Sequence, residues 1–339
     1  MINKDHATAF DYILQLSSGY WKSCVLFTAA EFDIFTLVGK DKLTARDISR
    51  SIRTNERATE MFLNALVSLE LLTKQGNYYL NTPLSELYLV KGKPLYQGDG
   101  VHHFHNMMEN WSMLRETIET GKAVSLKDLP EDVDPHDLRD FITAMHNFAS
   151  ARAGELCELI DLKNSKRLLD LAGGPGTYAI ACAQANPQLH AVVFDLEHVT
   201  KLTREFINAA GMKDRVITLT GNCLEDPLGN NEYDAVLVSN LLHIYNAENN
   251  VKILKKCWNA LRDGGQIIIH EFVLDETKTH PQFAALFSLN MLIGTQEGAS
   301  YSESEYRTWL EKAGFESMRR IDLKTSSAII IGKKNNPPE

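Results

Sequence analysis

Residues 167–179 read Arg-Leu-Leu-Asp-Leu-Ala-Gly-Gly-Pro-Gly-Thr-Tyr-Ala, and this stretch decides the fold. A short apolar run contains Asp170 near its end, turns through three glycines and continues as a helix-like segment. Gly173, Gly174 and Gly176 allow a ligand to approach the backbone closely, as in strand–turn–helix units that bind nucleotide-like molecules. The pattern therefore predicts such a unit, with its ligand at the carboxyl end of the strand.

Strands and helices alternate from about residue 165 onward. Helical patterns, for example at 199–210 and 248–261, separate six apolar runs that predict strands. These runs are 167–171, 191–194, 216–219, 235–238, 266–272 and 328–331. A series of this kind predicts an α/β fold with a mostly parallel, Rossmann-like sheet covered by helices. The tail 333–339 is polar and is expected to be loose.

The first hundred residues follow a different pattern. Apolar residues recur at helical spacing over 9–38, and Thr44 is a plausible N-cap for a further helix. Another helix is expected to start at 54–57, and residues 71–80 predict a hairpin that turns at a Gly-Asn pair. Helix, helix and hairpin in this order predict a winged helix.

A winged helix has two common uses, DNA binding and protein packing. Helix-turn-helix units often read the major groove. The presumed recognition helix and its end hold Arg57 but also Glu56, Glu60 and Glu70, which oppose binding to phosphates. The sequence therefore favours a packing or dimerisation unit.

Length and composition limit the classes of protein further. The chain has 339 residues, with a formal charge of 35 − 44 = −9, so we expect two domains and no nucleic-acid partner. Five scattered cysteines, no signal-peptide pattern and no apolar run of membrane-spanning length predict a cytoplasmic protein without a membrane span. We expect a winged-helix domain at 1–100, connecting helices at 101–160 and a ligand-binding domain at 161–339.

Four loops after predicted strands carry groups that suit the ligand. The glycine turn is the first. Asp195, followed by Leu196, comes directly after strand 191–194 and can bind two ribose hydroxyls. Asn222 and Cys223 follow the next strand, where an amide could bind an adenine amino group and an apolar residue could contact its face. Asn240 closes the fourth strand.

Two ligands fit these loops, and electrostatics discriminates between them. Gly174, Gly176 and Ala179, with Asp195 about 20 residues on, also satisfy the dinucleotide fingerprint of NAD enzymes. NAD would bring a pyrophosphate to the turn, where Asp170 would repel it. S-adenosylmethionine brings an ammonium and a sulfonium, which a carboxylate favours. The sequence thus favours S-adenosylmethionine.

The chain resembles the class I S-adenosylmethionine-dependent O-methyltransferases of the plant caffeate and vertebrate hydroxyindole (acetylserotonin) type, including their bacterial relatives. The resemblance covers nearly the whole chain and rests on the order and spacing of 170–176, 193–196, 225–228, 242–243, 264–265, 288–292 and 313–315. It implies an N-terminal winged-helix dimerisation domain, hence a homodimer, and a C-terminal methyltransferase domain.

The resemblance also implies catalytic residues. The family's catalytic histidine matches His243, and the carboxylate that orients it matches Glu271. The usual Asp and Trp after the histidine are replaced here by Ile244 and Tyr245. A second family carboxylate has only an uncertain match, Glu297. A histidine base suits a phenol, whose proton must leave near pH 7.

An acceptor pocket is expected between the helices of 101–160 and those of 280–300. An aromatic, apolar lining would suit a flat phenolic acceptor. The candidate lining residues are Phe104, Trp111, Met145, Phe148, Phe287, Asn290 and Met291. The histidines at 102, 103 and 105 lack the accompanying ligands of a metal site, so no metal is expected.

Several alternatives remain open at this point. A NAD-dependent oxidoreductase would share the glycine turn. An S-adenosylmethionine-sensing winged-helix regulator would explain the altered neighbours of His243. A C- or N-methyltransferase could use the same scaffold, because a fold does not fix its chemistry.

Overall fold

The protein is described by a computed structural model over residues 6–39, 41–124 and 135–335. The chain forms two compact units that divide between Asn106 and Met107, within helix α7 (Gly98–Ser112). In the sequence, Pro130 and Pro135 predict a loop between two helices, and Pro130 lies outside the described residues.

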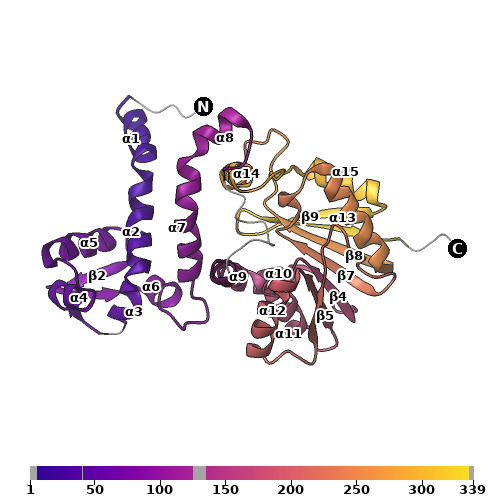
Figure 1. Cartoon of the computed structure of the whole chain (residues 1–339), viewed down its shortest axis with the longest axis horizontal. Helices are drawn as coiled ribbons and strands as arrows, with labels where there is room; N and C mark the ends of the chain where they lie inside the picture. The colour runs from indigo at the N-terminus through magenta and orange to yellow at the C-terminus, as the bar shows by residue number, and fades with distance from the viewer. Residues whose placement is uncertain (1–5, 40, 125–134, 336–339) are drawn as a thin grey trace. The chain divides into compact units, whose positions relative to one another are not determined.

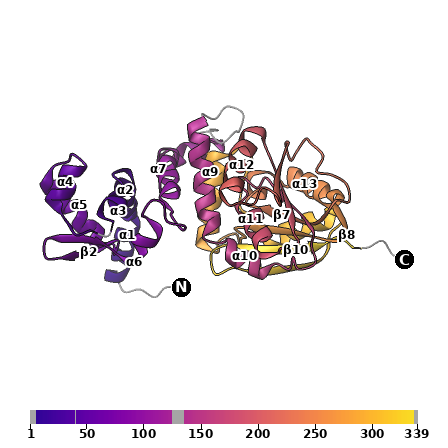
Figure 2. The same cartoon turned by 90° about the horizontal axis from the view of Figure 1, so that it is seen from below.

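The first unit is helical and carries a small antiparallel sheet in the order β1-β3-β2. Figure 2 shows α4, α5 and β2 grouped together, and with β3, the antiparallel partner of β2, they are the helices and hairpin of a winged helix. The elements are α1 (His6–Ser17), α2 (Gly19–Glu31), α3 (Ile34–Val38), β1 (Leu43–Thr44), α4 (Ala45–Ser51), α5 (Glu56–Ser68), β2 (Leu72–Gln75), β3 (Tyr78–Asn81) and α6 (Pro83–Tyr88).

The sequence signals for helix starts in this unit are confirmed. The Thr44 side chain accepts a hydrogen bond from the backbone N–H of Asp47, and the Asp47 side chain accepts one from the backbone N–H of Thr44. Helix α4 therefore begins with a capping box. Asn55 caps α5 by accepting from Ala58 at 3.0 Å. The hairpin turns at Gly76, as its Gly-Asn pair predicts.

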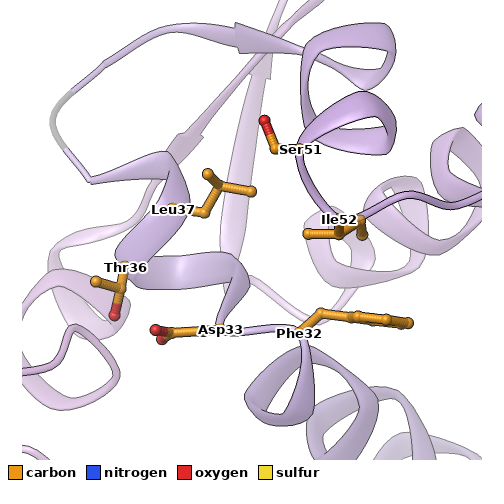
Figure 3. A pocket seen from close by; sticks show the side chains of 6 residues that line it. All are labelled: Phe32, Asp33, Thr36, Leu37, Ser51 and Ile52. Carbon is orange, nitrogen blue, oxygen red and sulfur yellow. The ribbon is translucent and has the colours of Figure 1, made fainter.

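A cavity of about 320 Å³ lies in the first unit between α3 and the end of α4 (Figure 3). Apolar side chains such as Leu37 and Ile52 line it beside Asp33, whose carboxylate is paired with Lys91 at 3.2 Å. It contains none of the residues expected to bind the ligand, all but one of which lie in the second unit.

The second unit is built on a seven-stranded sheet in the order β6-β5-β4-β7-β8-β10-β9 (Figure 1). The strands from β6 to β8 run parallel, and β10 is antiparallel to both β8 and β9. The strands are β4 (Arg167–Leu171), β5 (His190–Asp195), β6 (Val216–Thr220), β7 (Tyr233–Ser239), β8 (Leu261–Glu271), β9 (Glu316–Asp322) and β10 (Ala328–Lys333). The mostly parallel Rossmann-like sheet expected from the sequence is confirmed.

Helices cover both faces of this sheet (Figure 1). One core packs β4, β5, β7 and β8 against α13 and α15, and the other packs the opposite face against α10, α11 and α12. Strands buried on both faces read as continuous apolar runs, which is why they were readable in the sequence. The helices are α8 (Leu114–Thr120), α9 (Pro135–Ser150), α10 (Ala153–Leu159), α11 (Thr177–Ala185), α12 (Glu197–Ala209), the 3₁₀ turn η1 (Leu242–Ile244), α13 (Ala247–Ala260), α14 (Gln282–Gly294) and α15 (Glu303–Ala313).

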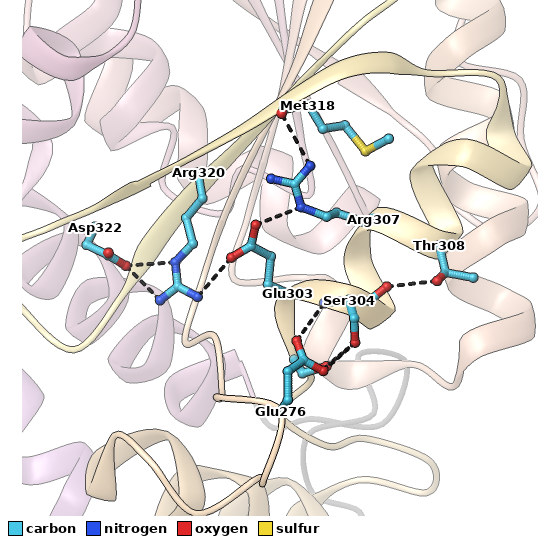
Figure 4. Close-up of polar contacts among 9 residues, drawn as sticks. Glu276, Glu303, Ser304, Arg307, Thr308, Met318, Arg320 and Asp322 are labelled. Carbon is cyan, nitrogen blue, oxygen red and sulfur yellow. Dashed lines mark hydrogen bonds and ion pairs between the residues drawn. The ribbon is translucent and has the colours of Figure 1, made fainter.

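Strand β9 was not expected from the sequence. It lies at the sheet edge, and Met318 and Ile321 are the only apolar residues among its seven, so it lacks the apolar run of a buried strand. Figure 4 shows what holds it: Arg320 pairs with Glu303 of α15 at 3.3 Å and with Asp322 at 2.7 Å, and Glu303 also binds Arg307 at 2.7 Å. An ion-pair network therefore fixes an edge that apolar burial does not.

The expectation of a loose tail from residue 333 is wrong for its first part. Lys333 ends β10, and Lys334 is only 3% exposed. The Lys334 ammonium donates to the carbonyls of Leu261 and Trp258 and to the side chain of Asn231, at 2.7, 3.1 and 2.9 Å. Three acceptors in one place bury a charge that the sequence alone assigns to solvent.

The described residues contain neither a membrane-crossing helix nor a metal-binding cluster. Within the described ranges, no helix combines the length and apolarity that a membrane crossing requires. In the same part of the chain, no three side chains of histidine, cysteine or carboxylate type gather as a metal-binding set.

Candidate active site

The glycine turn lies where the strand order reverses, since β4 has β5 on one side and β7 on the other. This is the position at which open α/β sheets bind ligands. Gly173 must be glycine because a Cβ there would lie 2.6 Å from the Asp170 carboxyl group. Gly176 has φ +73°, and a Cβ would lie 3.1 Å from both Thr203 and Val193. The turn is thus packed directly against the Asp170 carboxylate.

Asp195 ends β5 and ties its loop to the glycine turn. One carboxylate oxygen accepts from the backbone of Gly174 at 2.8 Å, and the other accepts from Leu196 at 2.7 Å. The side chain is 8% exposed. Each oxygen retains a second lone pair, so the carboxylate can still accept from a hydroxyl.

Among the residues that the structure describes, no positive group pairs with Asp170 or Asp195, the two carboxylates at this end of the sheet. Burial raises the pKa of Asp170 to about 7, against the effect of the Ala179 backbone amide, and the charge of Asp195 adds to the rise. Burial also raises the pKa of Asp195 to about 6, although its two backbone hydrogen bonds lower it. A cation placed here would stabilise both charges.

Buried oxygen atoms without hydrogen bonds also indicate a site for a cationic group. Within the described residues, neither carboxylate oxygen of Asp170 has a hydrogen bond of normal geometry, and the amide oxygen of Asn240 is likewise buried without one. Pairing of Asp170 with Leu237 and of Leu171 with Val238 brings the end of β7, and so Asn240, level with the turn. Orphaned acceptors suit an ammonium group and oppose a pyrophosphate. The residues present therefore fit S-adenosylmethionine.

The third loop, which follows β6, is closed on itself. The Asn222 side chain accepts from the backbone of Leu224 at 2.9 Å, and the Asn222 backbone donates to Asp226 at 2.8 Å. Cys223 is buried, and its thiol lies 3.7 Å from the hydroxyl of Tyr245. Tyr245, which stands where the family usually has Trp, thus contacts Cys223, the residue expected to cover the adenine.

His243 and Glu271 form a buried pair. His243 lies in η1 after β7, Glu271 ends β8, and these strands are neighbours. The imidazole Nδ1 is 2.7 Å from one Glu271 oxygen, and the other oxygen accepts from the backbone of Leu242 at 2.8 Å. The side chains of His243 and Glu271 are 9% and 1% exposed. A carboxylate held as an acceptor requires a proton on Nδ1, which leaves Nε2 as a proton acceptor.

An aromatic cluster extends from this pair. The Phe287 ring meets the His243 ring edge to face with centroids 4.9 Å apart. Phe287 is 4.7 Å from Phe272, which is in turn 4.9 Å from Phe283. Phe287 is half-buried and Phe283 is 41% exposed, so part of this cluster is open to a ligand.

The other residues expected to line an acceptor pocket are only partly brought together. Trp111 donates from its indole nitrogen to the side chain of Asn290 at 2.9 Å, which links α7 to α14. Met291 lies on α14, while Met145 and Phe148 lie on α9; all three are half-buried. Phe104 belongs to the first unit, where it is 46% exposed, so the structure of the second unit does not place it.

The uncertain carboxylate Glu297 is exposed and accepts from the side chain of Asn249 at 3.1 Å. No contact between Glu297 and the His243 ring is present among the described residues. The family's second carboxylate thus has no counterpart in contact with His243 at this position.

Two residues near the site were missed by sequence reasoning. His270 lies directly before Glu271 and bridges Ser239 at 2.9 Å and Ser327 at 3.0 Å, wholly buried. Arg152 lies at the start of α10, and its guanidinium is 5.9 Å from the centre of the Phe272 ring. Neither belongs to a motif, and the strand alternation that places His270 toward α11 was the only available signal.

The sheet order, the glycine turn with its unpaired carboxylates and the strand-end histidine define a class I S-adenosylmethionine-dependent methyltransferase. The family model described as an O-methyltransferase domain matches residues 126–316, and the one described as an O-methyltransferase dimerisation domain matches residues 14–91. The chain belongs to this family and is an S-adenosylmethionine-dependent O-methyltransferase. This decides against NAD, the other ligand that the glycine turn allowed.

Relatives cover nearly the whole chain. A 3-hydroxy-5-methyl-1-naphthoate 3-O-methyltransferase of Streptomyces sahachiroi is 32% identical over 328 residues, 95% of this chain and 94% of that protein. The N,N-dimethyltransferase OxyT of Streptomyces rimosus is 30% identical over 332 residues, 95% of this chain and 96% of that protein. The crystal structure of human N-acetylserotonin methyltransferase with S-adenosylmethionine matches at 25% identity with a TM-score of 0.89, covering 99% of this chain and 100% of that chain.

Proposed function

We propose that the enzyme methylates a hydroxyl group on an aromatic small molecule, with His243 as the base and Glu271 as the residue that positions it. The observation that carries this proposal is the 2.7 Å contact between Nδ1 of His243 and the buried Glu271 carboxylate. The name of the naphthoate methyltransferase relative supports a hydroxylated aromatic acceptor. The relative OxyT is named an N,N-dimethyltransferase, so an amine acceptor is the second candidate. An amine has less need of the base that this pair supplies.

In methyl transfer to a hydroxyl group, the protein has to remove one proton from the acceptor. S-adenosylmethionine, when bound, supplies the electrophilic methyl group. The His243 imidazole accepts the acceptor's hydroxyl proton at Nε2, and the Glu271 carboxylate stabilises the imidazolium that results. Glu271 also receives the backbone N–H of Leu242, so the pair is held to the loop that follows β7. Burial of both side chains excludes water from the proton's path.

The cofactor would be held by the loops at the carboxyl ends of β4 to β7. Asp170, the glycine turn and Asn240 would receive the amino-acid portion, where acceptor oxygens are unsatisfied. Asp195 and the adjacent Leu196 would receive the ribose. The loop of Asn222 and Cys223 would receive the adenine.

The acceptor would lie against the second unit's aromatic residues. Phe287 of α14 borders His243. Asn290, which accepts a hydrogen bond from Trp111, and Met291 lie further along the same helix. Met145 and Phe148 of α9, and Phe104 of the first unit, stay candidates on sequence grounds. This proposal keeps 1–100 as the dimerisation domain, 101–160 as connecting helices that contribute to the acceptor pocket, and 161–339 as the methyltransferase domain.

A His243→Gln variant tests the proposal. We expect kcat with 2-naphthol to fall by about 10²–10⁴ while the calorimetric Kd for S-adenosylhomocysteine is unchanged. His190→Gln, the same change at an exposed histidine that begins β5, is the matched control. Undiminished turnover in His243→Gln at saturating acceptor would show that His243 is not the base.

We also propose a homodimer formed through the first unit. The matched dimerisation domain supports it, as does a row of exposed apolar side chains on α1 and α2, among them Phe10, Ile13 and Trp21 at 63, 58 and 63% exposure. Ile13→Asp should give a monomer by sedimentation equilibrium, whereas the same change at exposed Ile118 of the second unit should not. A dimer unaffected by Ile13→Asp would argue against this surface. A cytoplasmic location stays a prediction, supported by five free cysteines.

A further inference from the structure

Arg152 stands apart from the other arginines of the second unit. Within the described part of that unit, five other arginines are half-buried, and each has an ion pair or donates to main-chain carbonyls: Arg167, Arg215, Arg262, Arg307 and Arg320. Arg152 is also half-buried, yet no carboxylate or carbonyl of the described residues lies within bonding distance of its guanidinium. Among those residues, the side chain that its guanidinium contacts is Phe272, over whose ring face it lies.

A half-buried guanidinium without an anion is an unusual arrangement. Buried charges are normally paired, because removing them from water costs free energy that a partner must offset. A cation–π contact at 5.9 Å holds the planar group in place but satisfies none of its five N–H donors. The fork of donors therefore remains available to a bidentate anion such as a carboxylate.

The surroundings of Arg152 belong to the methyl-transfer site. Phe272, on which the guanidinium lies, contacts Phe287, and Phe287 contacts the ring of His243. The positive charge also reaches the buried groups behind the site: burial lowers the pKa of His270 to about 4, and among the nearby charges Glu271 opposes and Arg152 adds to that shift. Base and guanidinium thus lie at two ends of one aromatic surface.

We propose that Arg152 binds a carboxylate carried by the acceptor, so that the preferred substrates are hydroxyaryl carboxylic acids. The aromatic rings of the acceptor would lie along Phe287 and Phe272, with the reacting hydroxyl at His243 and the carboxylate at Arg152. The inference rests on the proposed function and refines its substrate class. The carboxylate of the cofactor is the other source of the same chemistry, and the experiment separates the two.

The experiment compares three acceptors that differ in one group: 3-hydroxy-1-naphthoate, the corresponding carboxamide, and 2-naphthol. KM and kcat are measured for the wild type, Arg152→Gln, Arg152→Lys and the control Arg139→Gln, which removes an exposed guanidinium paired with Glu205. Calorimetry gives the Kd of each acceptor with S-adenosylhomocysteine present, and the Kd of S-adenosylhomocysteine and of 5′-methylthioadenosine alone.

In the wild type we expect the naphthoate to bind most tightly. In Arg152→Gln its KM and Kd should rise by about 10- to 100-fold, as loss of a charge-assisted pair predicts, with kcat retained. The carboxamide and 2-naphthol should be unaffected, Arg152→Lys should recover part of the loss, and Arg139→Gln should match the wild type.

Three results would overturn the inference. Equal losses for all three acceptors would mean that Arg152 is only structural. Weaker binding of S-adenosylhomocysteine, with 5′-methylthioadenosine and acceptor preference unchanged, would assign Arg152 to the cofactor's carboxylate. A naphthoate that binds no better than 2-naphthol in the wild type would remove the acceptor carboxylate altogether. Failure of the proposed function looks different, since none of the acceptors would then be methylated, or His243→Gln would turn them over unchanged.

Discussion

Replacing Glu271 by Gln changes one atom of the catalytic pair and keeps its volume. The carboxylate accepts from Nδ1 of His243 at 2.7 Å with one oxygen, and from the backbone of Leu242 at 2.8 Å with the other. A glutamine has one acceptor oxygen and one NH₂ group. If the oxygen keeps the Leu242 bond, the NH₂ faces Nδ1, and the imidazole must carry its proton on Nε2 instead.

The size of the effect follows from that reversed tautomer. His243 then presents a donor to the acceptor's hydroxyl, so the base is absent although the ring has hardly moved. The comparable change in a serine protease triad lowers kcat by about 10⁴, and general-base losses usually lie at about 10²–10⁴, so we expect a value in this range. If the amide rotates the other way, two donors meet at the buried Leu242 N–H, which costs about 1–3 kcal/mol of stability.

Initial-rate kinetics and thermal unfolding separate these two outcomes. In Glu271→Gln, kcat should fall while KM and the cofactor Kd stay near wild type. The double variant with His243→Gln should be no slower than His243→Gln alone, because residues that act as one unit are not additive. An additive double variant, or a kcat unchanged in Glu271→Gln, would refute the assignment of Glu271 as the positioning residue.

Three further predictions concern the turn, its charge and the chain end. Burial raises the pKa of Asp170 to about 7, so the folded apoprotein takes up a proton that the unfolded chain does not hold near neutral pH. The stability of the apoprotein should therefore fall as pH rises through 7, by a few kcal/mol at most. Asp170→Asn should flatten this dependence in thermal melts at pH 5.5 and 8. Gly173→Ala places a Cβ 2.6 Å from that carboxyl group and should cost about 1–3 kcal/mol in denaturant unfolding, whereas Gly154→Ala, whose Cβ meets open space in α10, should be neutral or slightly stabilising. Lys334→Met leaves three acceptors without their donor and should cost about 2–4 kcal/mol, while Lys333→Met, at an exposed position, should change little; equal melting temperatures for these two variants would contradict the role of the buried ammonium.

The sequence predicted the parts of the fold that are written locally. Strand β4 and its turn are an apolar run followed by glycines, and both features reflect burial on two faces and close backbone packing. Thr44 and Asn55 cap their helices through bonds that span three residues. Such signals need no knowledge of distant contacts.

The parts that sequence reasoning missed are fixed by distant contacts. Strand β9 depends on ion pairs from Arg320 to Glu303 on another element. Lys334 is buried because carbonyls at Trp258 and Leu261, more than seventy residues earlier, converge on it. A lysine in a polar tail and one in a carbonyl cage read alike in the sequence, so only the assembled sheet distinguishes them.

The candidate site shows the same division. His243 and Glu271 could be paired from the sequence because each ends a strand, and neighbouring parallel strands bring their ends together. The tautomer of His243 could not, because it depends on which ring nitrogen faces the Glu271 carboxylate, and only the structure identifies that nitrogen as Nδ1. Arg152 lay outside every motif, and only the ring of Phe272 reveals its place.

The unpaired charges of the site form a complementary set. In the part of the chain that the structure describes, Asp170 and Asp195 are buried carboxylates without a cation, and Arg152 is a half-buried cation without a carboxylate. An apoprotein selected for stability alone would pair these groups or replace them with apolar ones. Keeping them apart reserves the carboxylates for a cationic cofactor and the guanidinium for an anionic acceptor. On this reasoning, binding of the cofactor and of a carboxylate acceptor should each stabilise the fold, and Arg152→Gln should abolish only the second stabilisation, which thermal shift measurements with each ligand alone and with both can show.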